Sequence, residues 1–125
     1  MTIVKTLDHL VITCQDVSKT VTWYEKRLGM RAEAFGTNSA GDDAPEEQQR
    51  MALKYGKQKI NLHQAGKEFE PKASTALPGT ADLCFEVEES VRLEDLLENL
   101  RKDKTMVFEA GGEIVERTGA KGNMR

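Results

Sequence analysis

Apolar and polar residues alternate near the start of the chain and again about 70 residues later. In HLVITC, residues 9–14, Leu10, Ile12 and Cys14 lie on one side of an extended chain. In DLCFEV, residues 82–87, the same alternation returns. A period of two is typical of a β-strand that buries one face, so both segments are predicted to be strands.

A helical pattern follows each of these strands. Residues 17–28 carry apolar side chains at helical spacing, follow Asp16, a typical N-cap residue, and end before Gly29, a typical C-cap. Residues 90–103 carry four leucines at the same spacing. The sequence therefore predicts two amphipathic helices.

Three shorter strands are expected between the first helix and a linker at about 67–79. They cover residues 30–36, 49–56 and 59–65, and the polar, acidic segment 37–48 separates the first two. Prolines and glycines mark the linker. A mobile loop is expected at the acidic segment.

The second half repeats the order of strand and helix, and a last strand, bent at two consecutive glycines, is expected over residues 106–119. This internal repeat predicts one α+β domain that covers the whole chain. Module one takes about 5–66, and an incomplete module two takes about 80–125. Counted by the repeat, two more strands would follow Arg125.

Composition narrows the class of partner. The 125 residues include 18 basic and 21 acidic side chains, for a formal net charge of −3, which gives no electrostatic footprint for nucleic acid or an anionic membrane. No apolar stretch is long enough for a membrane span. Cys14 and Cys84 are too far apart in sequence for a C-x-x-C motif, so both are expected to be packed free thiols. We expect a cytoplasmic protein with a small-molecule partner.

If the helices pack on the apolar side of the strands, the polar side chains face a shared, concave surface. The side chains predicted there are His9, Asn61, His63, Asp82, Cys84 and Glu86. Imidazoles fixed on strands with a carboxylate nearby are typical ligands of zinc, nickel, iron, manganese or copper. The simpler interpretation is that each histidine is a hydrogen-bonded strand residue.

The remaining candidates have simple structural explanations as well. Asp82 occupies the repeat position of His9 and is either a ligand or an exposed carboxylate at a strand end. Glu86 is either the carboxylate that moves a proton or a solvated strand residue. Arg117 and Lys121 could bind an anionic substrate group, or belong to a solvated basic turn.

Long stretches of the chain resemble the vicinal oxygen chelate superfamily, which includes glyoxalase I, bleomycin and fosfomycin resistance proteins and extradiol dioxygenases. LDHLVITCQDVSKTVTWYEKRLGM, residues 7–30, looks like its first strand and helix. KINLHQAGKEFEPKA, PGTADLCFEVEE and RTGAKGN are similar to the subgroup related to glyoxalase domain-containing protein 5.

The resemblance implies paired β-α-β-β-β modules that form a cupped sheet around a divalent metal ion. His9 matches the ligand position on the first strand. His63 falls at the ligand position on the fourth strand, where glyoxalase I usually has glutamate or glutamine. Asp82 falls where many members have histidine, and these three residues are the implied metal ligands.

The function implied is that of a glyoxalase I-like, metal-dependent lyase or isomerase acting on a small substrate with vicinal oxygen atoms. The ion would stabilise an enediolate while Glu86 moves a proton. An iron(II)-dependent extradiol-type dioxygenase is the alternative, because two histidines and a carboxylate also form its facial triad. A non-catalytic small-molecule binding or resistance protein is the third possibility. The family also implies a homodimer.

Overall fold

The structure is a computed structural model that describes residues 1–36, 41, 45 and 49–125. Most of the acidic segment 37–48 lies outside the described residues, and so does the expectation of a mobile loop there. The chain divides into two compact units, Met1–Leu83 and Cys84–Arg125. The architecture is α+β, as the sequence predicts.

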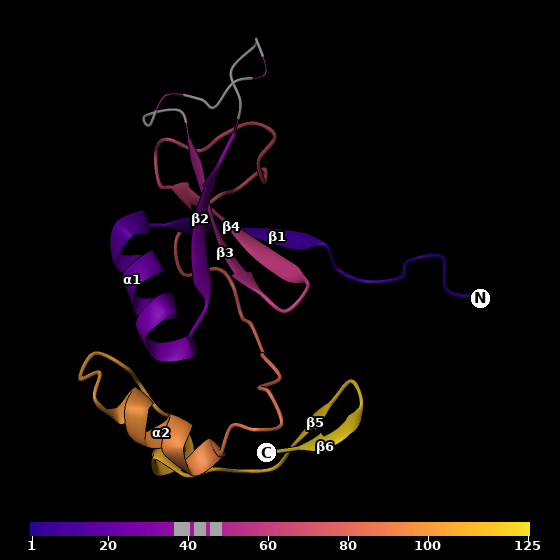
Figure 1. Ribbon diagram of the computed structural model, residues 1–125, viewed down its shortest axis with the longest axis vertical. Helices are drawn as coiled ribbons and strands as arrows, with labels where there is room; N and C mark the ends of the chain where they lie inside the picture. The colour runs from indigo at the N-terminus through magenta and orange to yellow at the C-terminus, as the bar shows by residue number, and fades with distance from the viewer. Residues whose placement is uncertain (37–40, 42–44, 46–48) are drawn as a thin grey trace. The chain divides into compact units, whose positions relative to one another are not determined.

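The first unit is a four-stranded mixed sheet with one helix (Figure 1). Its elements are β1 (His9–Cys14), α1 (Val17–Leu28), β2 (Arg31–Phe35), β3 (Arg50–Tyr55) and β4 (Gln58–Gln64). The strand order is β1-β4-β3-β2, in which β1 runs parallel to β4 and the other neighbours are antiparallel. All five elements lie where the alternating and helical patterns predict them.

Helix α1 is capped at both ends by the residues that the sequence indicates. The backbone N–H of Lys19 donates to Asp16 Oδ1 at 3.0 Å, which satisfies one of the free donors of the first turn. Gly29 ends the helix in the left-handed conformation, with φ of 64°.

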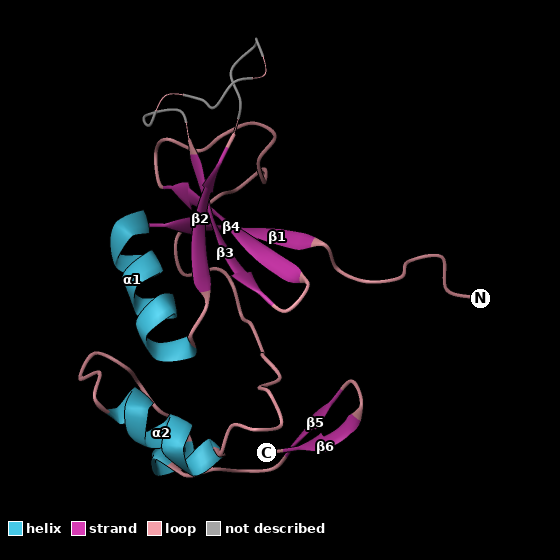
Figure 2. Cartoon of the chain, viewed as in Figure 1, coloured by secondary structure: helices cyan, strands magenta, loops and turns pink. Residues whose placement is uncertain are grey.

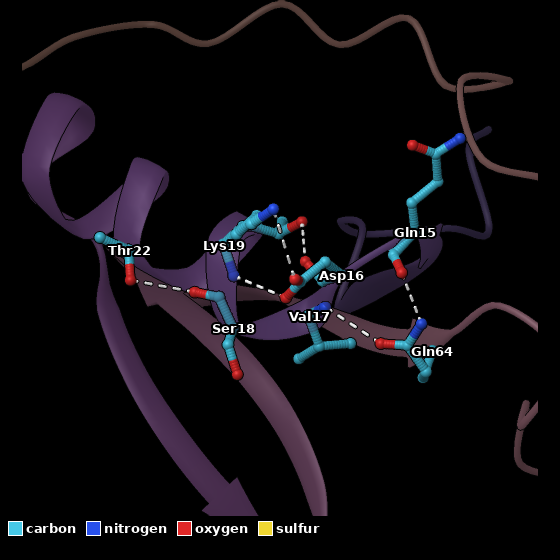
Figure 3. A network of polar contacts seen from close by, with 8 residues as sticks. Gln15, Asp16, Val17, Ser18, Lys19, Thr22 and Gln64 are labelled. Carbon is cyan, nitrogen blue, oxygen red and sulfur yellow. Dashed lines mark hydrogen bonds and ion pairs between the residues drawn. The ribbon is translucent and has the colours of Figure 1, made fainter.

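The side chain of Gln64 joins the start of α1 to the end of β4 (Figure 3). Its Oε1 accepts from the backbone N–H of Val17 at 3.2 Å, and its Nε2 donates to the carbonyl of Gln15 at 2.6 Å. One amide thus satisfies backbone groups on both sides of the N-cap and fixes where the helix leaves the sheet.

The core of the first unit lies on the apolar side of the sheet. Leu53, Ile60 and Leu62 are fully buried there, and the pairing of Leu53 with Ile60 places these side chains on one face. Helix α1 contacts β2, β3 and β4. Burial of three large aliphatic side chains contributes about 1.5–3 kcal/mol each. The opposite face is left for polar groups.

The second unit contains α2 (Leu93–Arg101), the 3-10 turn η2 (Ala110–Gly112), and a hairpin of β5 (Arg117–Gly119) and β6 (Gly122–Met124). The position of α2 confirms the helix that the leucine pattern predicts within residues 90–103. Two expected strands are wrong. Residues 82–87 form no strand (Figure 2), and residues 106–119 contain η2 and only the first strand of the short hairpin.

Alternation alone does not make a strand, because a strand requires a neighbour to accept and donate its backbone hydrogen bonds. Residues 82–87 belong to neither of the two hydrogen-bonded sheets in the described part of the chain. In the strand expected over residues 106–119, Gly111, with φ of 67°, turns the backbone out of the extended conformation.

The prediction of two packed thiols is wrong for one of them: Cys14 is buried, but Cys84 is exposed, and both are free. No helix in the described part of the chain is long and apolar enough to span a membrane.

Candidate functional site

The side of the sheet opposite the core, here called the polar face, carries cross-strand rows of mostly polar side chains, with Val11, Ala52 and Phe35 among them. From β1 to β2, the first row is His9, Lys59, Lys54 and Arg31, and the second row is Val11, Asn61, Ala52 and Glu33. In the third row, Thr13 pairs with His63, and Phe35 pairs with Arg50. Each row is about 6.6 Å from the next along the strands.

His9 is held in one orientation by its neighbour in sequence. Its Nδ1 lies 2.7 Å from Asp8 Oδ1, and this hydrogen bond is the main cause of the lowered pKa of Asp8. The ionised carboxylate can only accept, so Nδ1 carries the proton. Nε2 of the exposed His9 is then the nitrogen left to bind a metal ion, which is the usual arrangement of a histidine ligand and its supporting carboxylate.

Asn61, in the second row, has a buried acceptor without a donor. The residue is 9% exposed, and within the described part of the chain no group hydrogen-bonds its Oδ1. An unsatisfied buried acceptor costs about 1–3 kcal/mol. Asn61 lies two residues along β4 from Lys59, the partner of His9, so the α-carbons of His9 and Asn61 are about 8 Å apart.

The sequence placed Asn61 on this face but gave it no role. The available signal was an amide between Ile60 and Leu62 in the most apolar part of β4. A polar side chain in such a strand needs a partner, and the structure shows that the protein itself supplies none for Oδ1 among the described residues.

His63 is buried, with 4% exposure, in the third row. Its ring contacts Phe69 edge-on at 5.8 Å between centroids, and the guanidinium of Arg50 lies 4.8 Å from the same phenyl ring. Burial, and after it the charge of Arg50, lowers the pKa of His63, so its imidazole is neutral at pH 7.

The two histidines share the polar face, as the alternation predicts, and they lie in different cross-strand rows. His63 lies four residues beyond Lys59, the partner of His9, which corresponds to about 13 Å along the strands. Asn61 lies between them. Joint ligation of one ion by His9 and His63 stays a prediction, and Asn61 is the nearer partner for His9.

The other candidates are placed elsewhere. Asp82 is exposed at the end of the first unit. In the second unit, Glu86 accepts two hydrogen bonds from Lys121 Nζ, at 2.8 and 3.1 Å, and both side chains are exposed. Arg117 Nη2 lies 3.1 Å from Glu109 Oε1. The predicted proton-transfer carboxylate and a predicted substrate-binding lysine are thus paired with each other, and their catalytic roles stay predictions.

The polar face offers two donor groups, on neighbouring strands, that could hold a divalent ion. Within the described residues no three His, Cys, Asp or Glu side chains are gathered for a metal ion. His9 Nε2 and Asn61 Oδ1 nevertheless supply one imidazole nitrogen and one amide oxygen, the donor types that bind manganese, iron, nickel and zinc. The physical reason to expect an ion there is the buried Asn61 Oδ1, to which no described residue donates a hydrogen bond.

Comparison with known proteins agrees with the architecture. Residues 6–121 match the Glyoxalase/Bleomycin resistance protein/Dioxygenase superfamily, and the chain belongs to this superfamily. The resemblance seen in the sequence is confirmed.

Two curated relatives are similar over nearly the whole chain. Glyoxalase domain-containing protein RDO1 of Mycosarcoma maydis is 47% identical over 119 residues, which cover 95% of this chain and 58% of that protein. Virulence protein STM3117 of Salmonella typhimurium is 42% identical over 122 residues, which cover 98% of this chain and 74% of that protein. The chain thus spans less than two thirds of the length of RDO1.

Solved structures show the same fold. The crystal structure of STM3117 matches with a TM-score of 0.79 at 42% identity and covers 98% of this chain and 84% of that one. An integron cassette protein from the mobile metagenome of V. cholerae matches with a TM-score of 0.78 at the same identity and coverage.

Proposed function

We propose that the chain is a glyoxalase-like, metal-dependent enzyme that acts on a small substrate with vicinal oxygen atoms, at the polar face around His9 and Asn61. The observation that carries the proposal is the buried, unpartnered Oδ1 of Asn61 one strand away from His9. Superfamily membership and the glyoxalase domain name of RDO1 support it.

The roles proposed for Asp8, His9 and Asn61 follow from their contacts. Asp8 keeps the proton on His9 Nδ1 and so presents Nε2. Asn61 is held by its strand neighbours and offers an oxygen to which no described residue donates a hydrogen bond. When bound there, a divalent ion would polarise a substrate carbonyl. For the three candidates of the second unit we keep the roles predicted from the sequence: Glu86 as the carboxylate that moves a proton, and Arg117 and Lys121 as the side chains that bind an anionic substrate group.

Metal affinity tests the site directly. We expect Mn²⁺, Ni²⁺ or Zn²⁺ to bind the wild-type chain in isothermal titration, and His9→Ala and Asn61→Leu each to lower the affinity at least about tenfold. His63→Gln is the matched control, and its affinity should stay within about twofold of wild type. Equal loss in all three variants would support the ligand set predicted from the resemblance, and no loss in the first two would refute the site.

Turnover separates the possible functions. Metal-dependent conversion of the methylglyoxal–glutathione hemithioacetal supports the lyase or isomerase, whereas dioxygen uptake with Fe(II) and a catechol supports the dioxygenase. Ligand binding that a chelator leaves unchanged, without turnover, supports a binding protein. If Glu86 moves the proton, Glu86→Gln should lower kcat with the fold and the metal affinity unchanged.

The homodimer and the cytoplasmic location are proposals too. The strand β1 is an edge of its sheet in the first unit, with one neighbour only, and edge strands offer unpaired backbone groups to another chain. Sedimentation at several protein concentrations tests the dimer, and a single monomeric species throughout would refute it.

A further inference from the structure

A basic pocket lies at the end of the sheet where β3 turns into β4. Its volume is about 590 Å³, and its wall includes four cationic side chains, Arg31, Lys54, Lys57 and Lys59. Among the described residues, Asp8 is the one acidic group of this wall. Four cations against one carboxylate leave an excess of three positive charges, in a chain whose formal net charge is −3.

The sheet itself assembles these charges. Arg31 pairs with Lys54, and Lys54 pairs with Lys59, so three cations stand side by side on neighbouring strands of the polar face. Like charges directly opposite each other destabilise a sheet. Glu33 compensates part of the charge: its Oε2 lies 3.1 Å from Lys54 Nζ and 3.7 Å from Arg31 Nη2. The four cations together with the carboxylates of Asp8 and Glu33 therefore carry a net charge of +2.

The turn adds a cation that is free to reach a ligand. Gly56, with φ of 50°, and Lys57 form the two-residue turn between β3 and β4. Lys57 is exposed, and within the described residues it has no ion-pair partner. Gln58 Nε2 donates to the carbonyl of Leu7 at 2.9 Å and so holds the segment before β1 at the rim of the pocket.

We propose that this pocket binds the phosphate dianion of a small organic phosphate ester. Two uncompensated positive charges match a dianion, and guanidinium and ammonium groups are the usual phosphate-binding side chains. The volume exceeds what inorganic phosphate alone would fill, so the pocket has room for the organic group of a small phosphate ester. The site needs no metal ion and does not depend on the proposed glyoxalase-like activity.

The probe is phenyl phosphate, added to the full chain at low ionic strength in the presence of EDTA. We expect saturable binding at one site, weakening as NaCl is added, because exposed charges are screened by salt. In heteronuclear NMR spectra the amide shifts should change around residues 54–59. Lys57→Glu and Arg31→Gln should each weaken binding about tenfold, the effect of losing one charge-assisted contact.

Lys104→Glu is the matched control, since it makes the same change of charge at an exposed position in the second unit, outside the pocket wall. It should change the affinity less than about twofold. No saturable binding, equal losses in the Lys57 and Lys104 variants, or shift changes confined to other residues would overturn the site. Equal affinity for benzoate would overturn the phosphate ligand. Because EDTA is present, none of these results bears on the metal site.

Discussion

The two units of the chain use similar sequence patterns with different results. In the first unit, four paired strands bury Leu53, Ile60 and Leu62 on one face and hold Asn61 and His63 on the other. In the second unit, helix α2 has no buried residue, and Gly112 in η2 is the one buried residue of residues 84–125. Precise placement of side chains therefore comes from the hydrogen-bonded ladder of the sheet, and amphipathic alternation by itself does not supply it.

Truncation of a buried leucine should show the largest difference between the units. Leu53→Ala is expected to lower the free energy of unfolding by about 2–5 kcal/mol, because it leaves a cavity in a fully buried position. Leu96→Ala, in α2, is the matched control and should cost about 1 kcal/mol or less, because Leu96 is only partly buried. Urea unfolding measures both. Equal costs would contradict the view that the core belongs to the sheet of the first unit.

Removal of the buried acceptor Asn61 Oδ1 should raise the free energy of unfolding, whereas truncation of a buried leucine lowers it. Asn61→Leu is expected to stabilise the metal-free protein by about 1–3 kcal/mol, because it replaces an unsatisfied buried amide by an apolar side chain of similar size. Urea unfolding in EDTA measures the gain, and the same variant should lose metal affinity. Ala52→Val, beside Asn61 in the same row, is a control that fills space without removing a polar group. A destabilised Asn61→Leu variant would mean that the amide has a partner in solution.

The sequence predicted the first unit closely and the second only in part. Two of the signals that predicted the first unit are local: the capping residues Asp16 and Gly29, and the alternation in β1 and β4. Each depends only on residues within or next to one element. The failure at residues 82–87 arose because a strand depends on a partner that no local pattern reveals. For His9 and His63, alternation predicts the face of the sheet on which they lie, and only the register of the strands determines the row of each residue.

The two helices differ at their N-caps. Removal of the capping side chain from α1, or its introduction in α2, should change the stability of the protein moderately. Asp16→Ala is expected to cost about 0.5–2 kcal/mol, because it removes the acceptor for Lys19 N–H. Arg92, the N-cap of α2, makes no capping hydrogen bond, so Arg92→Asp should stabilise α2 by about 0.5–1 kcal/mol. Thermal unfolding followed by circular dichroism measures both. Ser18→Ala, one residue inside α1, controls for the change in helix propensity, and a loss there as large as for Asp16→Ala would contradict the capping role.

The smallest effect should come from protonation, and it should belong to the first unit, which holds both histidines of the chain. Burial lowers the pKa of His63 from its ordinary value of 6.5, so the folded protein binds this proton less readily than the unfolded chain. The contribution to stability is present above pH 6.5 and is lost as the pH falls through the folded pKa. The urea midpoint of the wild type should therefore fall from pH 8 to pH 5 by more than that of His63→Gln, which retains His9 as the internal control. Equal falls in both proteins would show that His63 is protonated as easily in the folded state as in the unfolded chain, and that its burial on the polar face is not maintained in solution.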